Sequence, residues 1–274
     1  MRTIHASLQE AEDTIGKVDA RVLVCDVLGV DRAYLATHPM HVLTETQDAL
    51  IDSLVAQREL GQPVAYLVGR REFYGRDFRV DANVLIPRPE TETLVEAVLA
   101  KLPAGPCDVL DLGTGSGAIA VTLACERPNA RVVAVDAEAG ALEVARANAG
   151  RLAPGRVELL AGSWYASVAG RRFDAIVSNP PYVAANDRHL GQGDLRFEPR
   201  AALTDGSPDG LDSIRAIAAG AAMHLNPGGW LLLEHGYDQA EAVRAVLERA
   251  GLFDLESHAD LAGIPRVAAG RPKP

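Results

Sequence analysis

The residues best suited to chemistry stand at 179–182, where the chain reads Asn-Pro-Pro-Tyr. The preceding run, 173–178, has the composition of a buried strand, so the tetrapeptide lies at a strand's C-terminal end, where open α/β sheets bind ligands. The two prolines remove two backbone donors and stiffen the turn. Asn179, the Pro180 carbonyl and the Tyr182 ring are then held near one point. These groups suit the binding of a flat, neutral nitrogen that donates N–H hydrogen bonds. The alternative is that these residues form a proline-rich turn between a strand and a loop, with no chemical role.

A glycine-rich turn stands upstream, between a predicted strand at 107–112 and a predicted helix at 117–126. Its residues are Gly113, Thr114, Gly115, Ser116 and Gly117. Glycine permits positive φ and close approach of the backbone to a ligand. The next predicted strand, 131–136, ends in Asp136, and an acid at that place can bind two ribose hydroxyls. The pattern therefore indicates a nucleoside-containing ligand.

The glycine motif alone does not identify that ligand. Gly113, Gly115 and Ala118 also fit the dinucleotide pattern G-x-G-x-x-G/A, which has an acid about 20 residues further on. Asp111 separates the two cases, because an acid two residues before the first glycine repels a pyrophosphate but can hold the cationic amine of a methionine moiety. We therefore expect S-adenosylmethionine rather than a nicotinamide dinucleotide.

With both motifs in place, nearly the whole chain resembles the protein-(glutamine-N5) methyltransferases that modify class I peptide-chain release factors. The glycine loop is general among methyltransferases, and Asn-Pro-Pro-Tyr is shared with amino-group methylases of DNA and RNA. The more discriminating segments are Ile-Pro-Arg-Pro-Glu-Thr-Glu at 86–92 and Arg-Phe-Glu-Pro at 196–199. One departure lies at 262–265, where Ala-Gly-Ile-Pro stands before Arg-Val and the family usually has Asn-Asp or similar.

The order of predicted elements indicates the fold class. From residue 107 onward, strands alternate with helices, which predicts a parallel sheet covered on both faces. The expected strands lie near 107–112, 131–136, 156–160, 173–178, 229–235, 253–258 and 265–270, and the expected helices near 117–126, 138–149, 210–222 and 238–250. The resemblance implies that the final strand is antiparallel, which gives a seven-stranded Rossmann-like α/β methyltransferase domain that depends on S-adenosylmethionine.

Three segments are expected along the chain. Residues 1–62 show apolar side chains at helical spacing and predict a small helical domain. Residues 63–89 form a connector with a β-hairpin whose turn is expected at Gly75-Arg76. Residues 90–274 are the methyltransferase domain. We expect 1–62 to dock a protein substrate, the alternative being that these helices only stabilise the catalytic domain. The long irregular stretch at 183–209 is typical of a functional loop, and its closure over the acceptor is a hypothesis that the sequence does not decide.

The resemblance implies roles for individual residues. The Asn179 side-chain oxygen and the Pro180 carbonyl accept the two N–H bonds of the glutamine amide, and Tyr182 packs on its plane. The expected catalytic residues are Asn179, Pro180 and Tyr182, and the acceptor site adds Pro181. The expected donor-binding residues are Asp111, Gly113, Thr114, Gly115, Ser116, Gly117, Asp136, Trp164 and Asn179. Apart from the resemblance, an ion pair with Arg196 or Arg200 on the loop is the simple structural interpretation of Glu198. No metal site is expected, since the leaving group of the donor is a neutral thioether.

Composition narrows the class further. The 274 residues are 48% hydrophobic and 23% charged, which fits one large domain plus a small one, and no apolar run predicts a membrane span. The first residues lack an apolar signal core, and three widely spaced cysteines are expected to be free thiols, so a cytoplasmic protein is expected. A monomer is expected as well, although no motif in the sequence indicates the oligomeric state. The net charge of −10 argues against nucleic acid as partner, because binding to phosphates requires a basic surface.

The predicted function is transfer of a methyl group from S-adenosylmethionine to N5 of the glutamine in the Gly-Gly-Gln motif of class I release factors. The alternative is an N6-adenine or other exocyclic-amine methyltransferase, because the same tetrapeptide chemistry serves a flipped base. A nicotinamide dehydrogenase fits the glycine loop only. A binding protein without catalysis would not need Asn179, Asp111 and Asp136.

Overall fold

The computed structural model describes residues 1–273, and the chain divides into two compact units. The first consists of Met1–Arg70 together with Gln192–Phe197, and the second of Arg71–Gly191 with the chain from Glu198 onward. The first unit thus extends beyond 62, and it includes a short piece of the segment that the sequence presents as one long loop.

The first unit is helical, as the sequence predicts. Its helices are α1 (Ile4–Ile15), α2 (Lys17–Leu28), α3 (Arg32–Thr37), α4 (Glu45–Glu59) and α5 (Val64–Val68). Polar side chains fix where these helices begin: Thr3 accepts from the Ala6 amide, and Thr44 forms a capping box with Gln47. Its buried core consists of Ile4, Val24, Leu35, Leu43 and Ile51.

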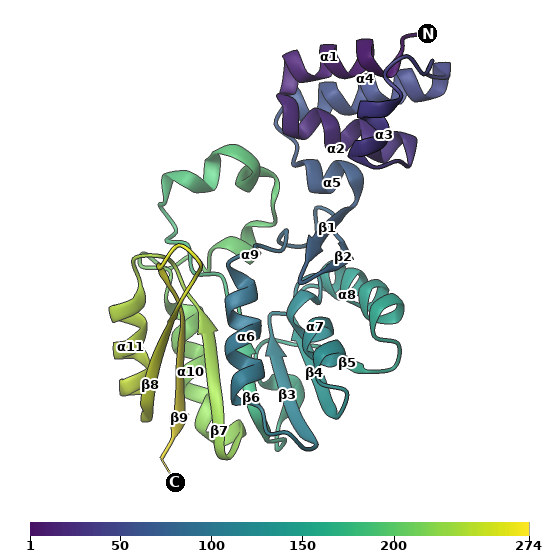
Figure 1. Ribbon diagram of the computed structural model, residues 1–274. Coiled ribbons are helices and arrows are strands. Elements are labelled where there is room, and N and C mark those ends of the chain that lie inside the picture. The colour runs from purple at the N-terminus through teal and green to yellow at the C-terminus, as the bar shows by residue number, and fades with distance from the viewer. Residues whose placement is uncertain (274) are drawn as a thin grey trace. The chain divides into compact units, whose positions relative to one another are not determined.

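The second unit is built on a seven-stranded sheet (Figure 1). Its strands are β3 (Cys107–Leu112), β4 (Ala130–Asp136), β5 (Val157–Ala161), β6 (Phe173–Ser178), β7 (Leu225–Glu234), β8 (Leu252–Ala259) and β9 (Pro265–Pro272). They lie side by side in the order β5-β4-β3-β6-β7-β9-β8. The pairs from β5 to β7 are parallel, and β9 runs antiparallel to both β7 and β8. The prediction of an antiparallel last strand is confirmed.

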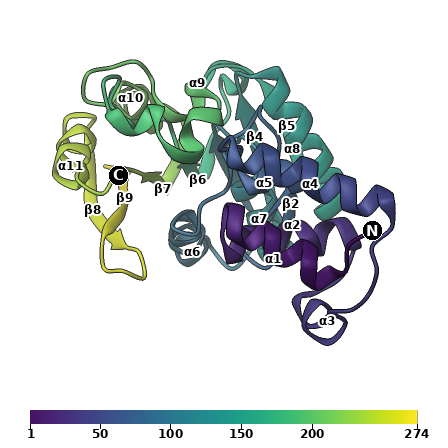
Figure 2. The same ribbon diagram turned by 90° about the horizontal axis from the view of Figure 1, so that it is seen from above.

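Helices cover both faces of this sheet (Figure 2). One face carries α6 (Thr91–Lys101), α7 (Ala118–Glu126) and α8 (Ala139–Leu152), and the other carries α10 (Asp212–His224) and α11 (Ala240–Arg249). Successive residues of a strand point to opposite faces, so Val109 packs in the first layer and Leu110 in the second. This two-sided burial explains why the strands read as continuous apolar runs.

Two local predictions need correction. The hairpin consists of β1 (Arg70–Phe73) and β2 (Arg76–Arg79), so its turn lies at Tyr74-Gly75 and not at Gly75-Arg76. Both turn residues have positive φ, as a two-residue hairpin turn of this hand requires.

The segment 183–209 is also not irregular throughout. It contains the 3₁₀ turns η2 (Arg188–Gly191) and η3 (Gly193–Phe197) and the short helix α9 (Arg200–Leu203). A further 3₁₀ turn, η1 (Ala166–Val168), follows β5.

All three cysteines are free; Cys107 is buried, whereas Cys25 and Cys125 are only partly buried. Within residues 1–273, no helix combines the length and apolar character needed to cross a bilayer.

Candidate active site

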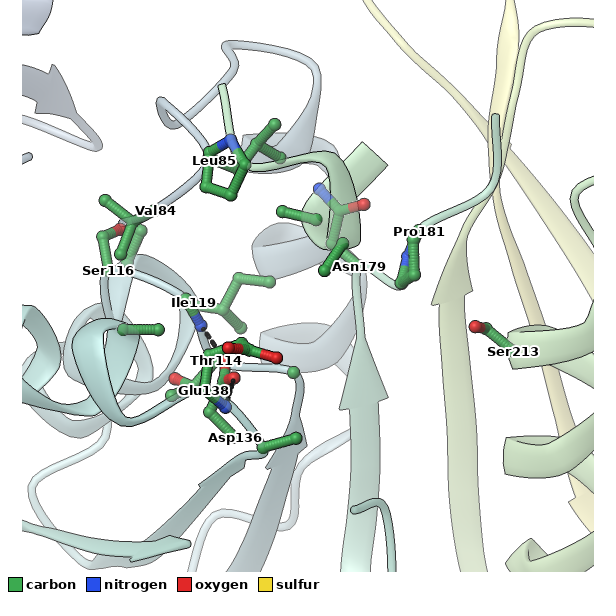
Figure 3. Close-up of a pocket in the computed structure, with 18 of the residues that line it drawn as sticks. Val84, Leu85, Thr114, Ser116, Ile119, Asp136, Glu138, Asn179, Pro181 and Ser213 are labelled. Carbon is green, nitrogen blue, oxygen red and sulfur yellow. Dashed lines mark hydrogen bonds between the residues drawn. The ribbon is translucent and has the colours of Figure 1, made fainter. Parts of the chain in front are cut away.

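A cavity of about 410 Å³ opens at the carboxyl ends of β3, β4 and β6 (Figure 3). This volume lies in the range of about 300–1,000 Å³ that is usual for small-molecule sites. Figure 3 shows Asp136 and Glu138 on one side of the cavity and Asn179 and Pro181 on another. Of the predicted site residues, those that line it are Gly113, Thr114, Gly115, Ser116, Asp136, Trp164, Asn179 and Pro181. The glycine loop and the Asn-Pro-Pro-Tyr turn therefore meet at one cavity.

The end of β4 fixes the shape of the glycine loop. The backbone N–H groups of Gly113 and Thr114 both donate to the Val135 carbonyl, at 2.8 and 3.1 Å. Asp136 accepts from the Gly115 amide through Oδ2 at 2.8 Å and from the Glu138 amide through Oδ1 at 3.0 Å. One carboxylate thus orders two backbone segments of the cavity wall while it remains part of that wall.

Asp111 lies behind the loop and does not line the cavity. Its side chain is fully buried, and Oδ2 accepts from the Thr114 hydroxyl at 2.7 Å. Its Oδ1 atom has no hydrogen-bond partner among the described residues. Burial raises the pKa of Asp111 to about 7. Gly117, at the start of α7, is likewise absent from the cavity lining.

The Asn-Pro-Pro-Tyr turn is tied to its surroundings by side-chain hydrogen bonds. The Asn179 Nδ2 group donates to Thr91 Oγ1 at 3.1 Å, and the Tyr182 hydroxyl donates to Glu234 Oε1 at 3.1 Å. Pro180 is buried, and neither Pro180 nor Tyr182 is among the lining residues. Burial, together with the adjacent Glu234 carboxylate, raises the pKa of Tyr182 above its usual value.

Trp164 lines the cavity after the end of β5. Its φ of 47° is in the left-handed region, which is costly for a large side chain and occurs where the surrounding structure enforces it. The indole lies close to the glycine loop, because a Cβ added at Gly113 would meet its Cζ3 atom at 3.6 Å. The ring therefore forms a flat apolar wall beside the loop.

Comparisons with known proteins agree over nearly the whole chain. Residues 1–69 match the family model described as PrmC N-terminal domain, and residues 90–194 match Methyltransferase small domain. A release factor glutamine methyltransferase of Xylella fastidiosa (strain Temecula1) is 51% identical over 267 residues, which are 97% of this chain and 97% of that protein. The chain belongs to the release factor glutamine methyltransferase family.

Further comparisons fit this membership. The protein of the same description from Burkholderia pseudomallei is 53% identical over 262 residues, 93% of this chain and 91% of that protein. The crystal structure of a methyltransferase from Pyrococcus furiosus has a TM-score of 0.55 and 20% identity, and the match covers 84% of this chain and 100% of the other. That likeness shows the fold alone.

The segments at 86–92 and 196–199, which carry much of the resemblance in sequence, meet through Glu198. This buried carboxylate accepts from the Ile86 amide at 3.0 Å and forms an ion pair with Arg88. The expected pairing with Arg196 or Arg200 is wrong, because those guanidinium groups donate to the carbonyls of Leu60 and Ala185. A fully buried carboxylate requires a cation and N–H donors, and the 86–88 turn supplies both.

Sequence reasoning missed several residues of this cavity. The cavity is also lined by Asn83, Val84, Leu85, Pro87, Arg88, Thr91, Glu138, Pro199, Ala202, Asp205 and Ser213. Thr91 and Arg88 belong to the 86–92 segment, so the resemblance offered a signal for them. No signal in the sequence indicated Asn148. This residue lies in α8, and its buried side-chain amide donates to the Ser116 carbonyl at 2.8 Å and so supports the glycine loop from behind.

Proposed function

We propose that this protein transfers a methyl group from S-adenosylmethionine to N5 of the glutamine side chain in the Gly-Gly-Gln motif of class I peptide-chain release factors. One observation carries the proposal: a single cavity joins a wall suited to a nucleoside, at Asp136, to a turn suited to an amide nitrogen, at Asn179. Membership in the release factor glutamine methyltransferase family supports the choice of substrate.

The chain's own residues fit the methyl donor. The Asp136 carboxylate would accept from two ribose hydroxyls, since each of its oxygens accepts from one backbone amide and keeps further lone pairs. Trp164 would flank the adenine, and the backbone at 113–117 would face the methionine and the ribose. The donor supplies an electrophilic methyl group on a sulfonium. We assign Asp111 the task of holding the loop through its hydrogen bond with Thr114.

The acceptor side must compensate for a weak nucleophile, because the lone pair of an amide nitrogen is delocalised into its carbonyl. In our proposal, Asn179 Oδ1 and the Pro180 carbonyl accept the two N–H bonds and aim the nitrogen at the methyl carbon, and Tyr182 packs against the amide plane. Holding two reactants in attack geometry can contribute roughly 7–11 kcal/mol. The N–C bond would form as the S–C bond of the sulfonium breaks, which leaves a neutral thioether, and the nitrogen would then release one proton to solvent water.

We propose that the helical unit docks the release factor. Most large apolar side chains that the described residues expose belong to this unit: Met1, Val18, Met40, Val42, Leu50 and Leu60. Met1, Met40 and Val42 come from two segments that lie side by side, because the Ile4 amide donates to the His41 carbonyl and Thr3 pairs with Val42. Binding energy from such remote surface can position the reacting glutamine.

We further propose that the protein acts as a cytoplasmic monomer. The free state of all three cysteines is consistent with a reducing compartment.

Mass spectrometry of a recombinant release factor after incubation with protein and S-adenosylmethionine tests the function. We expect the peptide that contains the Gly-Gly-Gln motif to gain the mass of one CH₂ group on its glutamine. A factor in which alanine replaces that glutamine is the control and should gain nothing. Methyl transfer to DNA or RNA, with an unmodified release factor, would contradict the proposal and support the exocyclic-amine alternative.

A further inference from the structure

A buried polar network lies behind the Asn179 turn. Besides the bonds from Asn179 to Thr91 and from Tyr182 to Glu234, the Thr91 hydroxyl lies near enough to the Glu234 carboxylate to lower the pKa of that carboxyl. Glu234 Oε2 has no hydrogen-bond partner among the described residues, so it is an acceptor still available to a neighbouring hydroxyl. Thr91 is 4% exposed and Glu234 is 2% exposed. The function proposed above gives these two residues no task.

The polarity of this network determines how the Asn179 amide is turned. An ionised carboxylate can only accept, so the Tyr182 hydroxyl points its hydrogen at Glu234. The Thr91 hydroxyl would point its hydrogen at the same carboxylate, which still has an acceptor oxygen without a partner among the described residues. A hydroxyl has one hydrogen, so Thr91 then offers only lone pairs to Asn179. Asn179 must present its NH₂ group to Thr91, and its oxygen is left for the cavity that the side chain lines.

We propose that Thr91 and Glu234 are positioning residues that orient the Asn179 amide so that its oxygen, and not its NH₂ group, faces the glutamine nitrogen. This inference rests on the proposed function. A reversed amide would set N–H donors against the N–H donors of the acceptor, and the nucleophile would lose its alignment. The methyl group of Thr91 can fill space but cannot orient the Asn179 amide, so the hydroxyl is the orienting group.

The protonation of Glu234 gives the network a pH dependence. Burial raises the pKa of Glu234 to about 7, against the lowering effect of Thr91, Tyr182 and the positive charge of Arg266; the negative charge of Glu90 raises it further. Protonated Glu234 can donate to Thr91, whose hydroxyl is then free to donate to the amide of the turn and reverse it. Turnover should therefore decrease as the pH falls through about 7.

The test compares Thr91→Val with Thr91→Ser in the full-length protein, at saturating donor and release factor. We expect kcat of Thr91→Val to fall about tenfold to hundredfold, which corresponds to about 1.4–2.7 kcal/mol. Donor affinity by calorimetry should be unchanged. Thr91→Ser keeps the hydroxyl and should retain most of the turnover. The matched control is Thr122→Val, because the Thr122 hydroxyl is buried in α7 without a partner among the described residues; its kcat should equal that of the wild type.

The pH profile separates orientation from simple packing. Wild type and Thr91→Ser should show the decrease of kcat on the acid side, whereas Thr91→Val should lose it. Equal damage in both variants, or an unchanged acid-side decrease in Thr91→Val, overturns the inference. Should Thr91→Val fail to fold, Glu234→Gln decides by the same two readouts, with a lowered kcat and a flat profile expected. If the wild type modifies the release factor and these variants match it, only this inference fails; if the wild type is inactive on the factor, the proposed function fails and this inference with it.

Discussion

Replacement of Asp136 by alanine should separate donor binding from chemistry. In the structure this carboxylate accepts from the amides of Gly115 and Glu138, at 2.8 and 3.0 Å, and it lines the cavity. The variant loses the charged acceptor for the ribose hydroxyls, and a hydrogen bond to a charged group contributes about 1.5–3 kcal/mol. The dissociation constant for S-adenosylmethionine should therefore rise about ten- to hundredfold, since each 1.4 kcal/mol corresponds to about a tenfold change.

The same substitution should also lower stability, because two backbone donors lose their partner. An orphaned donor costs about 1–3 kcal/mol when water cannot reach it, and the open cavity admits water, so we expect a loss of about 1–3 kcal/mol for the pair together. Asp136→Asn keeps one acceptor oxygen and should give smaller changes in both quantities.

Calorimetric titration measures the affinity, and thermal unfolding measures the stability. Asp108→Ala is the matched control: Asp108 lies at the amino end of β3, pairs with Arg131 and is outside the cavity lining, so its removal should leave donor affinity unchanged. A dissociation constant for Asp136→Ala equal to that of the wild type would refute the assignment of the ribose site.

Three other changes test separate parts of the site. Asn179→Ala should lower turnover about 10²–10³-fold, by analogy with the loss of an oxyanion-hole donor, while calorimetry finds donor affinity nearly unchanged; retention of more than half the wild-type turnover would contradict its role. Asp111 keeps its proton in the folded chain up to about pH 7 but in the unfolded chain only up to its ordinary pKa of 3.8, so stability falls as the pH rises through this window. Asp111→Asn removes that cost, and its stabilisation in thermal unfolding should be roughly 1–3 kcal/mol larger at pH 8 than at pH 5; equal shifts at both pH values would argue that Asp111 is ionised throughout. The double substitution Met40→Lys and Val42→Lys, on the exposed surface of the helical unit, should raise KM for intact release factor without changing donor affinity, and an unchanged KM would exclude this surface from docking.

Much of the second unit could be predicted because its strands and helices are marked by patterns within short stretches of the sequence. Strands buried on both faces read as apolar runs, and the alternation with helices predicts their parallel pairing. The positions of Asp136 and Asn179 followed from the rule that ligands bind at the carboxyl ends of such strands. These residues line one cavity as expected. The predicted hairpin turn was wrong by one residue, because the sequence alone does not show that Tyr74 and Gly75 are the two residues that adopt positive φ.

The predictions that failed or were missing depend on contacts between residues far apart in the chain. Glu198 was assigned a neighbouring arginine, yet it binds the turn at 86–88, because a buried carboxylate takes the donors that the fold brings to it. The short segment Gln192–Phe197 was expected in a loop of the catalytic domain and belongs to the helical unit, where Asp194 pairs with Arg58 at 2.8 Å.

The sequence by itself therefore determined the elements, the cavity's place at the carboxyl ends of the sheet, and the two motifs that meet there, because each depends on spacing within a few tens of residues. Only the tertiary structure decided which groups support those motifs. Thr91 and Glu234 are separated from the Asn-Pro-Pro-Tyr turn by long stretches of chain, and nothing in the sequence indicates that Thr91 binds Asn179 or that Glu234 binds Tyr182. Their roles arise because burial removes water, so a buried polar group can take hydrogen-bond partners only from the groups that the fold places beside it.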